Sequence, residues 1–206
     1  SAAARHSPPS NAAMASTPDG RTPRVILASA SRARAMLLRN AGIDFAIEPA
    51  DIDEAAVKHH YRAAGRDAAG CAQALAEAKA KPVSERRADA LVIGADQILV
   101  AGDEWLDKPR DLVEAAGHLR RLRGRRHSLV TACCVFRGGS ALWQAVSVPE
   151  LTMWFFGEAF LAGYIAAEGD AVLGSVGAYR LEGRGVQLFA RIDGDVFAYW
   201  RCSGLR

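Results

Sequence analysis

Apolar positions along the chain alternate between short continuous runs and helical spacings, a pattern that is typical of an α/β fold. The run at residues 24–29 predicts a strand, and residues 31–40 predict a helix that ends at Gly42. Further strands are predicted at 45–48, 90–100 with a break at Gly94, 127–136, 141–148, 151–156, 185–192 and 196–200.

Apolar residues spaced three and four positions apart predict the helices between these strands. A helix at residues 68–81 is expected to end before Pro82, because an internal proline removes a backbone hydrogen bond. Residues 158–167 predict another helix, whereas the acidic segment 48–56 is expected to be a loop. In a helix predicted at residues 111–123, the apolar side is formed by Leu112, Val113, Ala116, Leu119 and Leu122.

The alternation of strands and helices continues without an internal repeat or a linker. It predicts one α/β domain over residues 24–206, with a mixed sheet. Half of the 206 residues are hydrophobic, which is enough for a sizeable core. Residues 1–23 are rich in alanine, serine and proline and are expected to form a disordered leader, with Met14 as a candidate start.

Charge and apolar runs argue against several classes of partner. A net charge of +3 without a dense basic stripe argues against nucleic acid and leaves small phosphorylated ligands open. The most apolar run, residues 151–167, is interrupted at Gly157 and is shorter than the roughly 20 residues of a membrane span. No membrane segment is therefore expected.

Cysteine spacing bears on metal binding and on the compartment. The four cysteines show no CxxC spacing, which argues against zinc and favours a reducing, cytoplasmic location. Cys133 and Cys134 are neighbours in a predicted strand, so their side chains are expected to leave it on opposite faces.

Polar residues gather where the first predicted strand meets the first predicted helix. Ser29, Ser31 and Arg34 lie there beside the free backbone N–H groups of the first helical turn, a favourable place for an anion. Simpler roles compete with this interpretation, because serine is a preferred N-cap and arginine on a helix is usually solvated. Capping by Ser31 leaves Ser29 unexplained.

Other charged residues are candidates for the same chemistry. Asp96 follows a very apolar strand, at the end where open α/β sheets bind ligands, although an aspartate there can also cap a turn. Lys108 precedes a proline in an extended segment and is either directed inward or an ordinary loop lysine. Glu77 and Lys81 have the spacing of a surface pair, which leaves Lys79 pointing elsewhere.

The order of these motifs along the chain is more specific than any one motif. The pattern S-x-S-x-x-R-x-x-L-L-x-x-x-G is followed by D-I-D-E, A-K-A, G-A-D, K-P-R-D, H-x-x-x-T and G-A-Y. This series resembles the Maf family of nucleoside triphosphate pyrophosphatases over residues 25–195. The resemblance implies a mixed, twisted β-sheet flanked by helices, with a central cleft.

The resemblance also implies a reaction and the residues that perform it. A nucleoside triphosphate would be hydrolysed between its α- and β-phosphates, with Mg²⁺ or Mn²⁺, by a hydrolase that acts on acid anhydrides. Asp96 matches the catalytic aspartate, which orients or deprotonates the attacking water. Glu54 matches the acid that holds the metal with Asp96, and Asp53 is the alternative. The phosphate-binding positions fall on Ser29, Ser31, Arg34, Lys79 and Lys108.

Two residues bear on which base is bound. The family branch similar to dTTP and UTP pyrophosphatases has threonine and glutamine at two positions where this chain has Gln97 and Glu182. The branch similar to 7-methyl-GTP pyrophosphatases has glutamine and glutamate there. A carboxylate accepts hydrogen bonds from guanine N1–H and its amine, but meets only acceptors at the uracil carbonyls. We therefore expect 7-methyl-GTP, with dTTP or UTP as the alternative; Glu182 could also be a solvated turn acid.

The chain departs from the family pattern in two places. Arg32 and Ala33 stand where the family usually has proline and a second arginine, and the usual final helix does not follow residue 200. An aromatic residue common near Ala33 is also absent, so base stacking would fall to Trp105, Tyr179 or Phe189.

A rival hypothesis is a non-catalytic nucleotide-binding regulator of cell division and septum formation. The retained Asp96 and Glu54 favour an enzyme over this alternative. The resemblance further suggests a homodimer. Surface or helix-face positions are expected for His59, His60 and His118.

Overall fold

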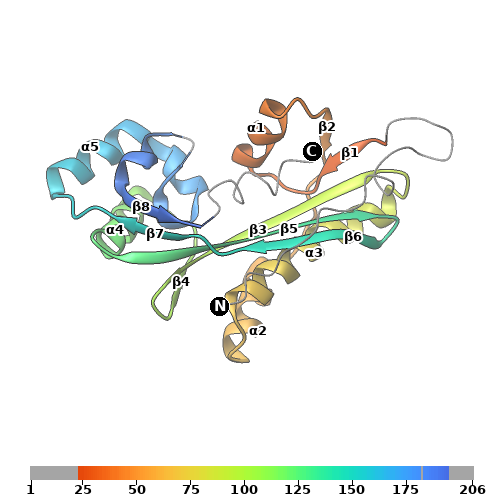
Figure 1. Cartoon of the computed structure of the whole chain (residues 1–206), viewed down its shortest axis with the longest axis horizontal. Coiled ribbons are helices and arrows are strands. Elements are labelled where there is room, and N and C mark those ends of the chain that lie inside the picture. The colour runs from red at the N-terminus through yellow and green to blue at the C-terminus, as the bar shows by residue number, and fades with distance from the viewer. Residues whose placement is uncertain (1–22, 182, 195–206) are drawn as a thin grey trace. The chain divides into compact units, whose positions relative to one another are not determined.

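The computed structural model of the chain describes residues 23–181 and 183–194, in which strands and helices alternate (Figure 1). The strands are β1 (Val25–Leu27), β2 (Phe45–Ile47), β3 (Leu91–Ala101), β4 (Glu104–Leu106), β5 (Arg126–Arg137), β6 (Ser140–Ser147), β7 (Glu150–Met153) and β8 (Phe189–Asp193). The α-helices are α1 (Arg32–Asn40), α2 (Glu54–Ala63), α3 (Ala68–Arg86), α4 (Leu112–Leu122) and α5 (Glu158–Glu168). Short 3₁₀ helices are η2 (Gly169–Gly174), η3 (Val176–Ala178) and η4 (Arg184–Leu188).

The strands form a mixed sheet, which confirms the predicted fold class. Its order is β2-β1-β3-β5-β7-β8, with β4 paired to β3 and β6 paired to β5. Strand β1 runs parallel to β2 and β3. The pairs β3–β4, β5–β7 and β7–β8 are antiparallel.

The chain divides into two compact units. Within the described residues, the first unit comprises 23–96 and 132–146, and the second comprises 97–131 and 147–194 without residue 182. Strands β3 and β5 contribute residues to both units.

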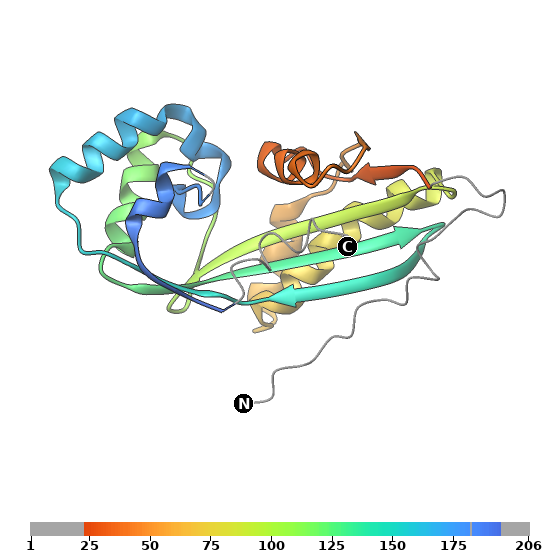
Figure 2. The same cartoon turned by 45° about the horizontal axis from the view of Figure 1, so that its top comes forward.

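In the first unit, helices cover both faces of the sheet (Figures 1 and 2). Helix α1 packs Ala35 and Leu38 against Leu91, Ile93 and Ala95 of β3. Helix α3 covers the other face at Gly94, where an added Cβ would meet the Ala76 carbonyl oxygen and would lie 2.8 Å from the Ala80 Cβ. Glycine at position 94 therefore lets α3 approach the strand closely.

The two neighbouring cysteines of β5 face opposite helices, as their alternation in a strand predicts. Cys133 belongs to the cluster with Leu38 and Ile93, beneath α1. The Cys134 thiol lies 3.6 Å from the Gly94 carbonyl oxygen, on the side of α3.

In the second unit, helices α4 and α5 pack together and share an apolar core with β7. Leu119 and Leu122 of α4, Leu151 of β7 and Leu161 of α5 are all buried there. The apolar run 151–167 thus forms part of β7 and most of α5. No helix of residues 23–181 and 183–194 has the length and hydropathy to cross a membrane.

Several predicted boundaries are wrong where tertiary contacts override local signals. Helix α3 continues through Pro82 to Arg86, and its last turn buries Val83 completely. The Ser84 hydroxyl in that turn donates to the Lys81 carbonyl at 2.8 Å and accepts from the Gly139 N–H at 3.1 Å. These contacts hold the turn after the proline.

Two other predictions fail for related reasons. Strand β3 is continuous through Gly94, because the glycine serves helix approach and does not break the strand. The expected acidic loop contains the start of α2, a helix with no buried residue.

The later elements require smaller corrections. On α4, Val113 is 80% exposed, whereas His118, expected at a surface or helix face, is buried. Residues 184–188 form η4 where a strand was predicted, and only 189–193 form β8. The strand predicted at 196–200 lies outside the described residues.

Candidate functional site

Three charged side chains meet in the first unit. The Lys79 ammonium lies 2.8 Å from Glu54 Oε1 and 2.5 Å from Asp96 Oδ1. The side chains of Lys79 and Asp96 are 9% and 6% exposed, whereas that of Glu54 is 45% exposed. One cation thus joins a buried carboxylate to one that reaches solvent.

The fold brings these residues together from three elements. Asp96 follows Gly94 by two positions in β3, so both face α3. Because Gly94 allows α3 to come close, Lys79 on that helix reaches Asp96. Glu54 is the first residue of α2, which packs against α3.

Asp53, the alternative metal-linked acid, has a structural task. Its Oδ1 accepts a hydrogen bond from the Ala56 N–H at 2.9 Å and so caps α2. This cap sets the start of the helix, and the next residue, Glu54, reaches Lys79.

The structure also brings together the three polar residues at the start of α1. Ser31 caps the helix by accepting from the Arg34 N–H at 3.4 Å. Ser29 Oγ accepts from the Arg34 guanidinium at 3.0 Å and from the Ser31 N–H at 3.3 Å. The N-cap role considered for Ser31 is therefore confirmed, and Ser29 forms one hydrogen-bonded group with Arg34.

Gln97 belongs to the second unit, where its side chain forms a hydrogen bond with Thr131. Its side-chain amide donates to Thr131 Oγ1 at 2.9 Å, and that hydroxyl lies 3.5 Å from the Leu129 carbonyl oxygen. Thr131 is buried, so it fixes the Gln97 amide in one orientation.

Lys108 lies exposed in the segment between β4 and α4, also in the second unit. Glu114 braces this segment, because its carboxylate accepts from the Arg110 N–H at 2.7 Å and from the Arg110 Nε at 2.9 Å. The hydrogen bond from Arg110 lowers the pKa of Glu114. Asp111 caps α4 beside them.

The G-A-Y motif forms a strained turn that directs Tyr179 inward. Gly177 and Ala178 both have left-handed backbones, with φ of +75° and +60°. A side chain on Gly177 would meet Leu99 and the Tyr179 ring. The Tyr179 hydroxyl lies 3.0 Å from His127 Nε2, and both side chains are buried. Glu182, four residues after Ala178, lies outside the described residues.

His127 and Thr131 were not predicted as site residues, although they contact Tyr179 and Gln97, respectively. Both belong to the H-x-x-x-T motif, and a four-residue spacing in a strand places them on one face of β5. Burial lowers the pKa of His127 to about 4, so its imidazole is neutral at physiological pH.

The surface pair expected between Glu77 and Lys81 is replaced by other contacts. Glu77 Oε1 accepts from the Gln73 amide at 2.9 Å and from the Gln144 amide at 2.8 Å. This carboxylate therefore ties α3 to β6.

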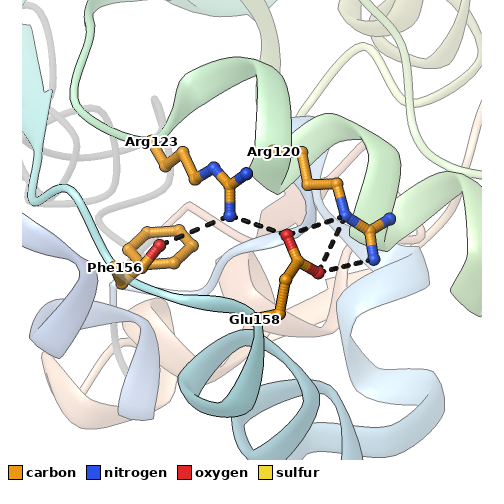
Figure 3. A network of polar contacts seen from close by, with 4 residues as sticks. All are labelled: Arg120, Arg123, Phe156 and Glu158. Atoms are coloured by element: carbon orange, nitrogen blue, oxygen red, sulfur yellow. Dashed lines mark hydrogen bonds and ion pairs between the residues drawn. The ribbon is translucent and has the colours of Figure 1, made fainter.

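A second ionic cluster lies in the second unit (Figure 3). Glu158 accepts from Arg120 at 2.9 Å and from Arg123 at 2.7 Å. The Arg123 guanidinium also donates to the Phe156 carbonyl oxygen at 3.4 Å. The cluster joins α4 to the start of α5 at the surface.

The acids of the first unit are compatible with the divalent cation that the resemblance implies. Carboxylate oxygens from Asp96 and Glu54 are the hard donors that Mg²⁺ and Mn²⁺ prefer. Within residues 23–181 and 183–194, no group of three or more His, Cys, Asp or Glu could hold a metal ion. An ion held by two carboxylates would complete its coordination shell with other ligands, such as water or phosphate.

Comparison with known proteins identifies the family. A sequence profile for Maf-like proteins matches residues 24–199. The chain belongs to the Maf family. A nucleoside triphosphate pyrophosphatase of Granulibacter bethesdensis is 52% identical over 85% of this chain and 89% of that protein. The 7-methyl-GTP pyrophosphatases of Rhizobium etli and Rhizobium meliloti are each 48% identical, over 85% of this chain and 88% of their own lengths. Membership of the Maf family confirms the resemblance drawn from the ordered motifs.

Proposed function

We propose that this chain is a nucleoside triphosphate pyrophosphatase that releases a nucleoside monophosphate and pyrophosphate. The observation that carries the proposal is the meeting of Glu54, Lys79 and Asp96 in one partly buried cluster. The relatives named as pyrophosphatases, at 48% to 52% identity, support the same activity. As a hydrolase acting on acid anhydrides, the chain would cleave the bond between the α- and β-phosphates.

Asp96 is the proposed catalytic residue. Lys79 engages its Oδ1, which leaves Oδ2 to accept a proton from the attacking water or to orient that water. A buried carboxylate in fixed orientation is suited to this role because little reorganisation is needed during the reaction.

The hydroxyls and guanidinium at the start of α1 are the proposed phosphate ligands. Ser29, Ser31 and Arg34 lie where the helix dipole favours negative charge. The guanidinium of Arg34 can form two parallel hydrogen bonds to one phosphate. Lys79 and Lys108 are the other proposed phosphate-binding cations.

Asp96 and Glu54 are the proposed ligands of Mg²⁺ or Mn²⁺. When bound there, the ion would neutralise charge on the triphosphate, which is the main requirement of phosphoryl transfer. Glu54 suits this role because nearly half of its side chain reaches solvent.

We propose 7-methyl-GTP as the nucleotide. Gln97 and Glu182 match the residues expected for that base, and several relatives carry the name 7-methyl-GTP pyrophosphatase. The carboxylate of Glu182 would accept from guanine N1–H and its amine and would face a base made positive by methylation. The cytoplasmic location and the homodimer remain predictions.

The test is pyrophosphate release from a panel of 7-methyl-GTP, GTP, dTTP and UTP, with and without Mg²⁺. We expect hydrolysis of 7-methyl-GTP that requires the metal and is lost in Asp96→Asn. Asp89→Asn, the same change at an exposed position of the first unit, is the matched control and should hydrolyse like the wild type. Binding of nucleotide without any hydrolysis would contradict the proposal and favour the regulator. Preference for dTTP or UTP would contradict only the assignment of the base. If that assignment is right, Glu182→Gln should weaken the preference for 7-methyl-GTP.

A further inference from the structure

The Lys79 ammonium lies on both carboxylates that the proposed function assigns to a divalent cation. Its distances of 2.8 Å to Glu54 and 2.5 Å to Asp96 are those of direct ion pairs. A second cation on the same two side chains would face the ammonium at close range, in a place where water screens charge poorly. The two cations therefore compete for the same acids.

Lysine is suited to leave such a position, because its charge sits at the end of a flexible four-carbon stem. The displaced ammonium needs a new anion, since only 9% of the Lys79 side chain is exposed and an unpaired buried charge is costly. A triphosphate bound beside the metal supplies that anion.

We propose that Lys79 occupies the cation position between Glu54 and Asp96 and moves to the substrate phosphates when a divalent ion binds. Lys79 thereby makes metal binding and nucleotide binding mutually dependent. The inference rests on the proposed function and adds to it a resting position for Lys79 between the two acids. It predicts that the protein without nucleotide binds metal weakly because Lys79 opposes it.

The first experiment measures Mn²⁺ affinity without nucleotide, from the electron paramagnetic resonance signal of free Mn²⁺. Lys79→Met removes the competing charge but keeps most of the stem, and we expect Mn²⁺ to bind about ten-fold more tightly. Lys81→Met removes an equal charge from an exposed position of the same helix. It should change the affinity less than about two-fold, because exposed charges are screened. Equal affinities of the Lys79→Met variant and the wild type would overturn the inference.

A second measurement uses the wild type and does not depend on the folding of a variant. Carbon-13 resonances of the Lys79 side chain should shift on saturation with Mg²⁺ and nucleoside α,β-methylene triphosphate, whereas those of Lys81 should not. An unmoved Lys79 resonance in that complex would overturn the inference. Neither measurement requires turnover. If the wild type hydrolyses nucleotides but Lys79→Met leaves the Mn²⁺ affinity unchanged, this inference is refuted and the proposed function is retained.

Discussion

Each unit of the molecule holds a three-membered ionic cluster, and the two clusters are opposite in charge pattern. In the first unit, one ammonium, Lys79, joins the carboxylates of Glu54 and Asp96. In the second unit, one carboxylate, Glu158, joins two guanidinium groups (Figure 3). The first cluster has an excess negative charge and two of its members are buried, whereas the second has an excess positive charge and reaches solvent.

The first cluster is suited to binding a ligand, whereas the second is suited to holding two helices together at the surface. Removing charges from water is costly, so a buried ion pair is weak support for stability and is often retained for another reason. Exposed pairs cost little and contribute little, because water and salt screen them. We infer that the acids of the first cluster serve a ligand, whereas Glu158 fastens two helices.

The largest effect is expected when one negative charge is removed from each cluster and the two variants are compared. Asp96→Asn should lower the rate of pyrophosphate release about 10³-fold, because the group proposed to orient the water is lost. Glu158→Gln should leave the rate within about two-fold of wild type, since an exposed pair contributes little. Initial rates with 7-methyl-GTP measure both. Similar losses in the two variants would remove the distinction between the clusters.

The next prediction concerns His127, a buried histidine of the second unit. The pKa of His127 is lowered by burial from 6.5 to about 4. Between these values the unfolded chain binds a proton that the folded protein excludes. The free energy of unfolding should therefore fall by about 3 kcal/mol as the pH drops through this window.

His127→Gln should flatten that dependence, because glutamine does not titrate and can still hydrogen-bond to Tyr179. Urea unfolding from about pH 7 to about pH 4.5 compares the slopes of the two proteins. Equal slopes would show that the pKa of His127 is the same in the folded protein as in the unfolded chain.

A third prediction tests whether close approach of a helix maintains the buried cluster. In Gly94→Ala, the added methyl group would meet the Ala76 carbonyl oxygen and lie 2.8 Å from the Ala80 Cβ. We expect a loss of about 1–3 kcal/mol in unfolding free energy and a fall in activity, as α3 and Lys79 move away from Asp96.

The matched control is Gly163→Ala, in the middle of α5. An added Cβ there has no neighbour within 4 Å among the described residues. Stability should rise by about 0.5–1 kcal/mol, because alanine favours the helix over glycine. A loss at position 163 equal to that at position 94 would mean that helix approach is not the cause.

The smallest expected effect concerns the surface cluster itself. The hydrogen bond from Arg120 lowers the pKa of Glu158 below 4.5, so the stabilisation from this acid is present above that pH and is lost as the pH falls. Thermal unfolding of Glu158→Gln should differ only slightly from wild type at neutral pH. The difference should vanish in strong acid and shrink in concentrated salt. A difference that persists in both conditions would contradict a screened surface role.

Prediction from sequence succeeds where an element depends on its own residues. The Ser31 cap and Gly42 delimit α1 almost as expected, and Asp111 begins α4. It fails where distant residues decide. Burial of Val83 carries α3 through Pro82, and α2 forms inside the predicted acidic loop.

The candidate site shows the same division. The ordered motifs indicate Glu54, Lys79 and Asp96, and these three residues do meet. Spacing along the chain does not reveal that Lys79 joins both acids, because the contact depends on how closely α3 approaches β3 at Gly94. It equally does not reveal that Glu77 pairs with Gln73 and Gln144.

The adjacent thiols of β5 provide built-in reporters of local opening. Cys133 should react with an alkylating reagent only after α1 detaches from the sheet. Cys134 should react only after α3 detaches from the opposite face. Pulsed alkylation followed by mass spectrometry would thus time the exposure of each sheet face separately in the unmutated protein. Two residues joined by one peptide bond would reveal which helical layer detaches first.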